Sequence, residues 1–428
     1  MARPVTVGID GYGKAVGRRE GGIDVWHGIP YAAPPVGLLR FAPPEPPQPW
    51  SPTKLDASRF APDCWQAIDP LLNPSSNEMS EDCLYLNIWT PAGHAARSRQ
   101  GTFLSGQRLL PVMVWLHGGA FQQGGANRPE YDGRRLAERE IVVVTFNYRL
   151  GALGFLVSSS DQIYGNFGLM DQRAAIYWIH EHIESFGGDP QRVTLFGESA
   201  GAVMTGLHLM MEGAGTLFHK AIMQSNPLGY TFRSVVVADF IGEALKRKVD
   251  CRDLACLRAE RVEEILGAQA SLMGVPRSVG DFFTWGPTLT REAKLQLTLH
   301  RDGSLVSRLE EHRLPRLESG QQFVSEWRLN RETLEAKSGS ARWSAVNVTQ
   351  PLSSLHLIPH DIPVMIGSNK HEGEMFVHSA FPVSMAKVRK CQKSCKYPLF
   401  SCITKSFKVL VCVSLARLLD VRGSLVSG

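Results

Sequence analysis

The sequence predicts an α/β fold with a mostly parallel central sheet flanked by helices on both faces. Two observations predict it. Short apolar, β-branched runs, typical of strands buried on both faces, cover residues 112–117, 141–146, 193–196 and 363–366. Between the second and third runs, apolar residues recur at helical spacing over 168–183. A succession of strand, helix and strand implies a parallel sheet covered by helices.

Composition indicates an ordinary globular protein, since 43% of the 428 residues are hydrophobic and 20% are charged. The net charge of +5 is concentrated in residues 386–428, which hold nine Lys or Arg and one Asp. We interpret this basic tail as a solvated end, and predict neither a nucleic-acid partner nor a membrane span. The apolar stretch 409–419 is interrupted by Ser414 and Arg417 and is too short to cross a bilayer.

The chain divides into one main domain over residues 1–385 and the basic tail over 386–428. Proline-rich stretches at 30–35 and 42–49 predict ordered loops, because proline lacks the N–H donor that helices and central strands need. Residues 289–360 lose apolar periodicity and fill with Arg, Glu and Ser, which indicates an atypical insertion.

Gly197-Glu-Ser-Ala-Gly201 follows a predicted strand and precedes a segment that can continue as a helix. This strand, G-x-S-x-G, helix context is that of a nucleophile elbow and predicts Ser199 as a catalytic nucleophile. Glycine is needed at both flanks, because a side chain there would collide with the adjoining strand or helix.

His117-Gly-Gly-Ala-Phe121 directly follows the predicted strand 112–116. The arrangement matches the HGGG-type motif of esterases, so the N–H groups of Gly118, Gly119 and Ala200 are expected to form an oxyanion hole. We interpret His117 itself as a structural residue beside the hole rather than the catalytic base.

With these motifs in place, the chain resembles the type-B carboxylesterase and cholinesterase family, whose members have an α/β-hydrolase fold. Further segments similar to family blocks are Gly28–Gly37, Glu81–Pro91, Asn147–Gly151, Gly165–Gln172, Phe186–Pro190 and Phe218–Ser225. The resemblance implies a disulfide between Cys64 and Cys83, and a second, smaller loop closed by Cys251 and Cys256. Disulfides fit an oxidising, secretory compartment, whereas no signal peptide is visible at the N-terminus. A missing first segment or unpaired thiols would resolve this conflict.

The resemblance places the triad acid at Glu372, within Gly367-Ser-Asn-Lys-His-Glu-Gly373. The family's histidine lies on the order of a hundred residues further on, whereas 56 residues follow here. His378 is the one histidine after Glu372, and its six-residue separation from the acid favours a surface position over a triad role. The tail from about residue 386 does not resemble the family, so the chain is expected to be truncated relative to it.

The predicted function is hydrolysis of small-molecule carboxylic esters through an acyl-enzyme. The alternative is a catalytically inactive member or truncated isoform that lacks the triad histidine and acts, if at all, as a binding protein. No cofactor is expected, because neither a P-loop nor a dinucleotide-binding glycine motif is present. No metal is expected either, since the tail cysteines lack the paired spacing of zinc sites.

Overall fold

The structure, a computed structural model, describes residues 3–67, 77–95, 108–211, 213–226, 232–272, 284–288, 294–299, 305–310 and 362–367. Its strands are β1 Arg3–Ile9, β2 Gly13–Glu20, β3 Ile23–Pro30, β4 Lys54–Asp56, β5 Asp63–Cys64, β6 Met79–Ser80, β7 Tyr85–Pro91, β8 Leu110–Leu116, β9 Val142–Phe146, β10 Val157–Ser158, β11 Ile163–Tyr164, β12 Gly188–Glu198, β13 Lys220–Gln224, β14 Lys294–Leu299, β15 Leu305–Glu310 and β16 Val364–Gly367. Its α-helices are α1 Arg134–Ala137, α2 Gly151–Phe155, α3 Phe167–His182, α4 Ala200–Leu209, α5 Val235–Lys248, α6 Leu254–Ala259 and α7 Val262–Leu272, and its 3-10 helices are Gly37–Leu39, Pro129–Tyr131, Ser159–Asp161 and Ile183–Phe186.

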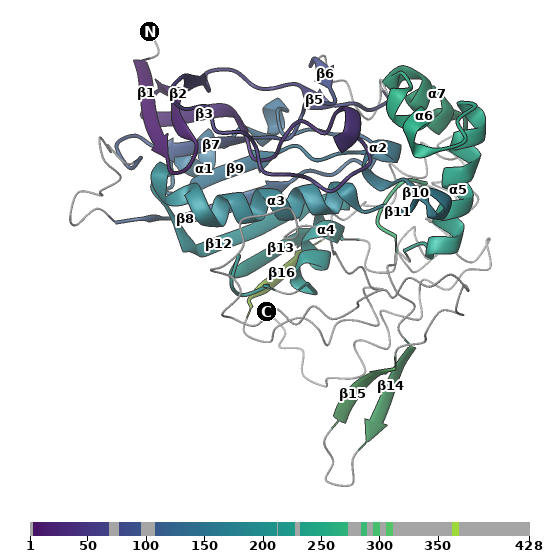
Figure 1. The fold of residues 1–428 in the computed structure, drawn as a ribbon. Helices are drawn as coiled ribbons and strands as arrows, with labels where there is room; N and C mark the ends of the chain where they lie inside the picture. Colours follow the sequence, from purple (N-terminus) through teal and green to yellow (C-terminus); the bar gives the residue numbers. More distant parts are fainter. Residues whose placement is uncertain are drawn as a thin grey trace, which may run out of the picture.

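The main sheet is mixed, with the described strands in the order β1-β2-β3-β7-β9-β8-β12-β13-β16, and with β4 beside β2 (Figure 1). Strands β1, β2, β3, β7 and β9 pair antiparallel with their neighbours in that order, and every pairing from β9 to β16 is parallel. The predicted parallel sheet is therefore the half that holds β8 and β12. The antiparallel half was not predicted from the sequence.

Helices lie on both faces of the sheet. Helices α3 and α4 pack on the face formed by inward residues such as Val114, Val144 and Leu195, which belong to the main core. On the opposite face, α1 packs on β7 and β9 around a smaller core that includes Trp89 and Val143. Helices α5, α6 and α7 form a group to one side of the sheet (Figure 1).

The elements expected from apolar periodicity are present. The four predicted strands correspond to β8, β9, β12 and β16, and the predicted helix corresponds to α3. The proline-rich stretches 30–35 and 42–49 are loops after the first residue, Pro30, which ends β3. Within 289–360 the described residues are β14 and β15, which pair as an antiparallel hairpin, and the rest of that segment and the tail lie outside the described residues.

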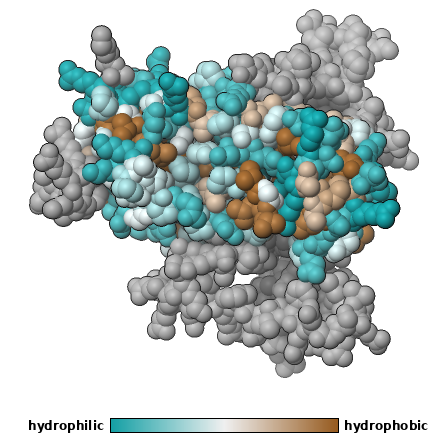
Figure 2. Space-filling model, turned by 45° about the horizontal axis from the view of Figure 1, so that its top comes forward, coloured by the Kyte–Doolittle hydropathy of each residue, from teal (hydrophilic) through white to brown (hydrophobic). Residues whose placement is uncertain are grey.

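Among the described residues, no helix is both long and apolar enough to cross a membrane. Figure 2 shows one face of the surface, on which hydrophilic residues predominate and apolar residues form separate patches.

Candidate active site

Ser199 lies at the junction between β12, which ends at Glu198, and α4, which begins at Ala200. Its backbone has φ 55° and ψ −120°, a combination that non-glycine residues rarely adopt. The N–H of Ser199 donates to the carbonyl of Gln224 on the neighbouring strand β13, at 3.0 Å. A strained backbone at a half-buried serine between a strand and a helix is the geometry of a nucleophile elbow.

The two glycines that flank the elbow have no room for a side chain. A Cβ on Gly201 would lie 2.0 Å from the carbonyl oxygen of Leu116, the last residue of β8. A Cβ on Gly197 would lie 2.6 Å from backbone atoms of Gly201 and 2.7 Å from the same Leu116 oxygen. The collisions expected from the sequence are therefore present, and they involve β8 and the start of α4.

The glycine turn after β8 lies directly against the elbow. A Cβ on Gly118 would be 3.4 Å from the Cβ of Ser199 and 2.8 Å from the carbonyl oxygen of Glu198. Gly119 has φ +116°, and a Cβ there would lie 1.9 Å from the carbonyl oxygen of Gln123. Strands β8 and β12 are parallel neighbours, so their carboxyl ends bring the two motifs together at one sheet edge.

Three backbone donors at this edge have no acceptor among the described residues: the N–H groups of Gly118, Gly119 and Ala200. Ala200 is the first residue of α4, so its N–H has no partner within the helix. Unpaired N–H groups at a helix start favour negative charge. The arrangement can thus stabilise an oxyanion next to Ser199.

His117 is buried and neutral. Burial lowers the pKa of His117 to about 4, although its hydrogen bond with the Gly118 carbonyl acts in the opposite direction. Its Nδ1 lies 2.9 Å from that carbonyl oxygen, which can only accept, so Nδ1 carries the proton. The ring stacks on Tyr148 at 4.3 Å between centroids, and the Tyr148 hydroxyl donates to the His117 carbonyl at 2.9 Å. These contacts fix the turn.

The structure does not describe the rest of the predicted triad. The predicted acid, Glu372, lies outside the described residues, and so does His378, which was expected at the surface. Among the described histidines, none forms a hydrogen bond with Ser199; these are His27, His94, His117, His180, His182, His208 and His219. The described residues also include no group of three or more His, Cys, Asp or Glu that could hold a metal ion.

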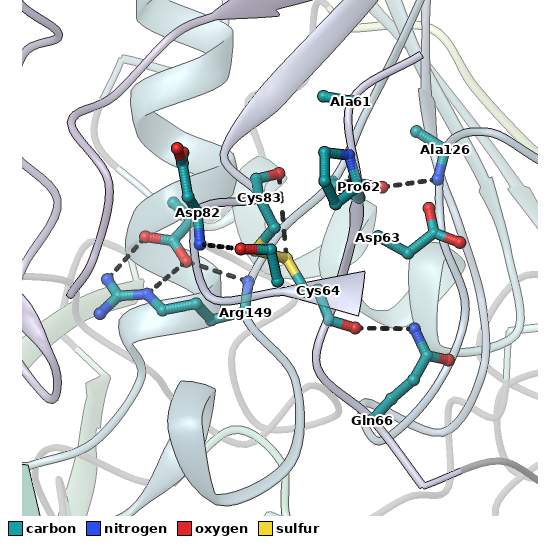
Figure 3. The surroundings of a disulfide bond; sticks show 12 residues. Ala61, Pro62, Asp63, Cys64, Gln66, Asp82, Cys83, Ala126 and Arg149 are labelled. Atoms are coloured by element: carbon teal, nitrogen blue, oxygen red, sulfur yellow. Dashed lines mark hydrogen bonds and ion pairs between the residues drawn. A yellow bond between two sulfur atoms is a disulfide. The ribbon is translucent and has the colours of Figure 1, made fainter. Parts of the chain in front are cut away.

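Both expected disulfides are present: Cys64 pairs with Cys83, and Cys251 pairs with Cys256. The first joins β5 to the residues just before β7, and Gln66 lies beside it (Figure 3). It therefore ties the segment before residue 68 to the central sheet, next to the candidate site.

Sequence reasoning missed two residues that contact the glycine turn, Tyr148 and Gln66. Tyr148 lies within the family-like block Asn147–Gly151, so a signal existed for its importance but not for its bond to His117. Gln66 bonds to both backbone groups of Gly124 from 58 residues away in the chain, and no local pattern indicates that.

Comparison with known proteins gives a consistent result. A family model described as the carboxylesterase family matches residues 6–405. The para-nitrobenzyl esterase of Bacillus subtilis (strain 168) is 49% identical over 220 residues, which are 50% of this chain and 42% of that protein. The fumonisin B1 esterase of Sphingopyxis macrogoltabida is 42% identical over 255 residues, 57% of this chain and 45% of that protein.

Solved structures agree in fold. The carboxylesterase EST55 of Geobacillus stearothermophilus at pH 6.2 superposes with a TM-score of 0.67 and 31% identity, covering 99% of this chain and 71% of that chain. A PNB esterase superposes with a TM-score of 0.64 and 34% identity, covering 87% of this chain and 64% of that chain. These neighbours establish the α/β-hydrolase fold. The chain spans less than half the length of the two esterases compared by sequence.

Proposed function

Since the chain belongs to the carboxylesterase family, we propose that it hydrolyses small-molecule carboxylic esters with Ser199 as the nucleophile. The observation that carries this proposal is the strained Ser199 at the strand–helix junction, with Gly118 beside it and three backbone N–H groups nearby that have no acceptor among the described residues.

In the proposed reaction, Ser199 Oγ forms a bond to the ester carbonyl carbon while its proton passes to a histidine base. The carbonyl oxygen becomes an oxyanion, which accepts hydrogen bonds from the N–H groups of Gly118, Gly119 and Ala200. The C–O bond to the alcohol then breaks, and the alcohol leaves with the proton. Water attacks the acyl-enzyme in the same manner and releases the acid.

Glu372 is the proposed residue that orients the base, in agreement with the family-like turn that contains it. Its carboxylate would hold the imidazole in the tautomer that accepts the serine proton. No residue is assigned to the base, because none of the described histidines bonds to Ser199.

The test is covalent labelling and turnover by the full 428-residue chain. A fluorophosphonate probe should label the chain at Ser199, and a p-nitrophenyl ester should be hydrolysed. Ser199→Ala should abolish labelling and lower kcat by about 10⁴- to 10⁶-fold, because the nucleophile and its base act as a unit.

The control for this experiment is Ser225→Ala. Ser225 also has a positive φ, of 54°, and follows the neighbouring strand β13, but it has no flanking G-x-S-x-G glycines. The Ser225→Ala variant should still be labelled, at Ser199. Folded wild-type chain that neither reacts with the probe nor hydrolyses the ester would contradict the proposal and favour a non-catalytic binding protein.

A further inference from the structure

The glycine turn that carries the candidate oxyanion donors is held in a strained conformation. Four residues of the turn have positive φ: Gly119 at 116°, Ala120 at 55°, Phe121 at 63° and Gly124 at 114°. For Ala120 and Phe121 this conformation is strained, because the Cβ approaches the following backbone carbonyl. Such a turn keeps its shape when neighbouring groups hold it.

Gln66 holds one end of this turn. Its Oε1 accepts from the N–H of Gly124 at 2.7 Å, and its Nε2 donates to the carbonyl oxygen of Gly124 at 2.7 Å. Nε2 also donates to the carbonyl oxygen of Cys64, at 3.0 Å. The side chain is 3% exposed, so water does not compete for these bonds. One amide therefore satisfies both backbone groups of a residue 58 positions away.

Gly124 transmits its position to the donors by direct contact. A Cβ on Gly124 would lie 2.5 Å from the carbonyl oxygen of Gly118 and 2.6 Å from Nδ1 of His117. A Cβ on Gly118 would in turn lie 3.4 Å from the Cβ of Ser199, so little space separates the two residues. Because no gap separates these groups, a displacement of Gly124 moves the peptide units that hold the Gly118 and Gly119 N–H groups.

The backbone next to Gln66 is held in place by a disulfide. Cys64 is two residues away and forms the disulfide with Cys83, two residues before β7 (Figure 3). Nearby, Asn127 Nδ2 donates to the carbonyl oxygen of Ala61 at 2.7 Å and to the carboxylate of Asp63 at 2.9 Å. The segment that contains Gln66 is thus held by the disulfide to the residues before β7 and by Asn127 to the residues just after the glycine turn.

We propose that Gln66 is a positioning residue for the oxyanion hole, in which it acts through Gly124 to hold the N–H groups of Gly118 and Gly119 in register with Ser199. The inference rests on the proposed ester hydrolysis. Gln66 itself touches no reacting atom. Loss of its hydrogen bonds to Gly124 should therefore weaken binding of the transition state more than binding of the ester.

Two variants separate hydrogen bonding from volume. Gln66→Met keeps the length of the side chain and removes its bonds to Cys64 and Gly124. Gln66→Glu keeps shape and the acceptor for the Gly124 N–H, but cannot donate when ionised and faces two carbonyl oxygens. For p-nitrophenyl acetate, both should lower kcat about 10- to 100-fold with KM changed less than about threefold, since a displacement of about 1 Å can cost roughly 100-fold.

The matched control is Thr90→Val. The Thr90 hydroxyl is fully buried and donates to the carbonyl of Phe186 at 2.9 Å, just before β12 and thus at the opposite end of that strand from Ser199. This variant also loses a buried side-chain-to-backbone bond. It should lower the melting temperature and leave kcat within about twofold of the wild type.

Hydrogen–deuterium exchange gives a second readout that does not depend on activity. In the two Gln66 variants, peptides covering residues 117–125 should exchange at least tenfold faster, whereas peptides from β1 and β2 should be unchanged. If the wild-type chain is inactive and unlabelled, the proposed hydrolysis fails, while hydrogen–deuterium exchange still tests whether Gln66 holds the glycine turn. The positioning role would be overturned if the Gln66 variants showed unchanged exchange or a kcat within twofold of the wild type. It would also be overturned if Thr90→Val lost as much kcat, or if neither Gln66 variant gave folded protein.

Discussion

At the scale of single residues, His27 illustrates how burial sets a charge state. Its ring stacks on Phe60, at 3.8 Å between centroids, and lies edge-on to Trp89. Burial, helped by the positive charges of Arg18 and Arg134, lowers the pKa of His27 from its ordinary value of 6.5 to about 3. The folded protein therefore keeps this imidazole neutral far below the pH at which the unfolded chain protonates it.

This difference predicts a pH-dependent contribution to stability. Above pH 6.5 both states are neutral at this position, so the pKa shift contributes nothing. As the pH falls from 6.5 toward 3 the unfolded state binds the proton first, and the free energy of unfolding decreases by about 1.4 kcal/mol per pH unit. His27→Phe retains a stacking ring without a titratable group. When the pH is lowered from 7.5 to 4.5, the melting temperature of this variant should fall less than that of the wild type. An equal fall in the two proteins would contradict the assigned cause.

The prediction for Ser199 and that for Gln66 belong to the same scale, and they differ in how they could have been found. Ser199 stands in a motif of five consecutive residues, so its proposed role can be predicted from the sequence alone. Gln66 lies between Trp65 and Ala67 with no recognisable pattern, and its partner Gly124 is identified by distance alone.

At the scale of elements, a buried ion pair joins α3 to the segment after β9. Arg149 Nη2 and Nε donate to the two carboxylate oxygens of Asp171 at 2.7 and 2.8 Å, and the backbone N–H of Arg149 donates to the same carboxylate at 3.0 Å. The side chains are 4% and 0% exposed. The pair therefore fixes the start of α2 against α3, close to the glycine turn.

Asp171→Asn should destabilise the protein by about 3 to 5 kcal/mol, because it leaves the Arg149 guanidinium buried without its counter-charge. The matched control is Asp189→Asn, which breaks the partly exposed pair with Arg192 and should cost less than about 1 kcal/mol. Urea unfolding followed by tryptophan fluorescence measures both. Equal losses in the two variants would show that burial does not decide the strength of the Arg149–Asp171 pair.

Element positions were predicted where periodicity is local. The strands β8, β9 and β12 and the helix α3 follow from apolar spacing within each segment. The antiparallel half of the sheet did not: β1, β2 and β3 pair locally with one another, but β3 joins β7 through residues up to about 70 positions apart.

At the scale of the whole molecule, two disulfides close loops of different length. Cys64 and Cys83 are 19 positions apart and join the site-proximal segment to the sheet, whereas Cys251 and Cys256 are 5 positions apart within one surface segment. A longer closed loop removes more conformational freedom from the unfolded chain.

Removing the two pairs by alanine substitution should therefore have unequal effects. Cys64→Ala with Cys83→Ala should cost about 3 kcal/mol, and Cys251→Ala with Cys256→Ala about 2 kcal/mol, by the loop-entropy relation. Each double variant serves as the control for the other in urea unfolding. A larger loss from the shorter loop would show that packing around the sulfurs outweighs loop entropy.

Burial along one face of the sheet changes across its parallel half. Register aligns Trp115, Phe196, Ile222 and Met365 in one row across β8, β12, β13 and β16. Trp115 is 8% exposed, whereas Met365 at the far end of the row is 64% exposed. Parallel sheets are normally covered on both faces, so this end of the row is one place at which the described fold leaves apolar surface in solvent.

The sequence by itself predicted the fold class, the strand–turn–helix context of Ser199, the glycine turn and the cysteine pairs, because each is encoded in contiguous residues or in family-like blocks. Only the tertiary structure decided that Gly118 packs against Ser199, that His117 is neutral with its proton on Nδ1, and that Gln66 holds Gly124. These features depend on distances between atoms far apart in the chain and on the loss of water around them. Folding alone sets these distances and this loss of water, because strands β8 and β12 must pair before their carboxyl ends form one site.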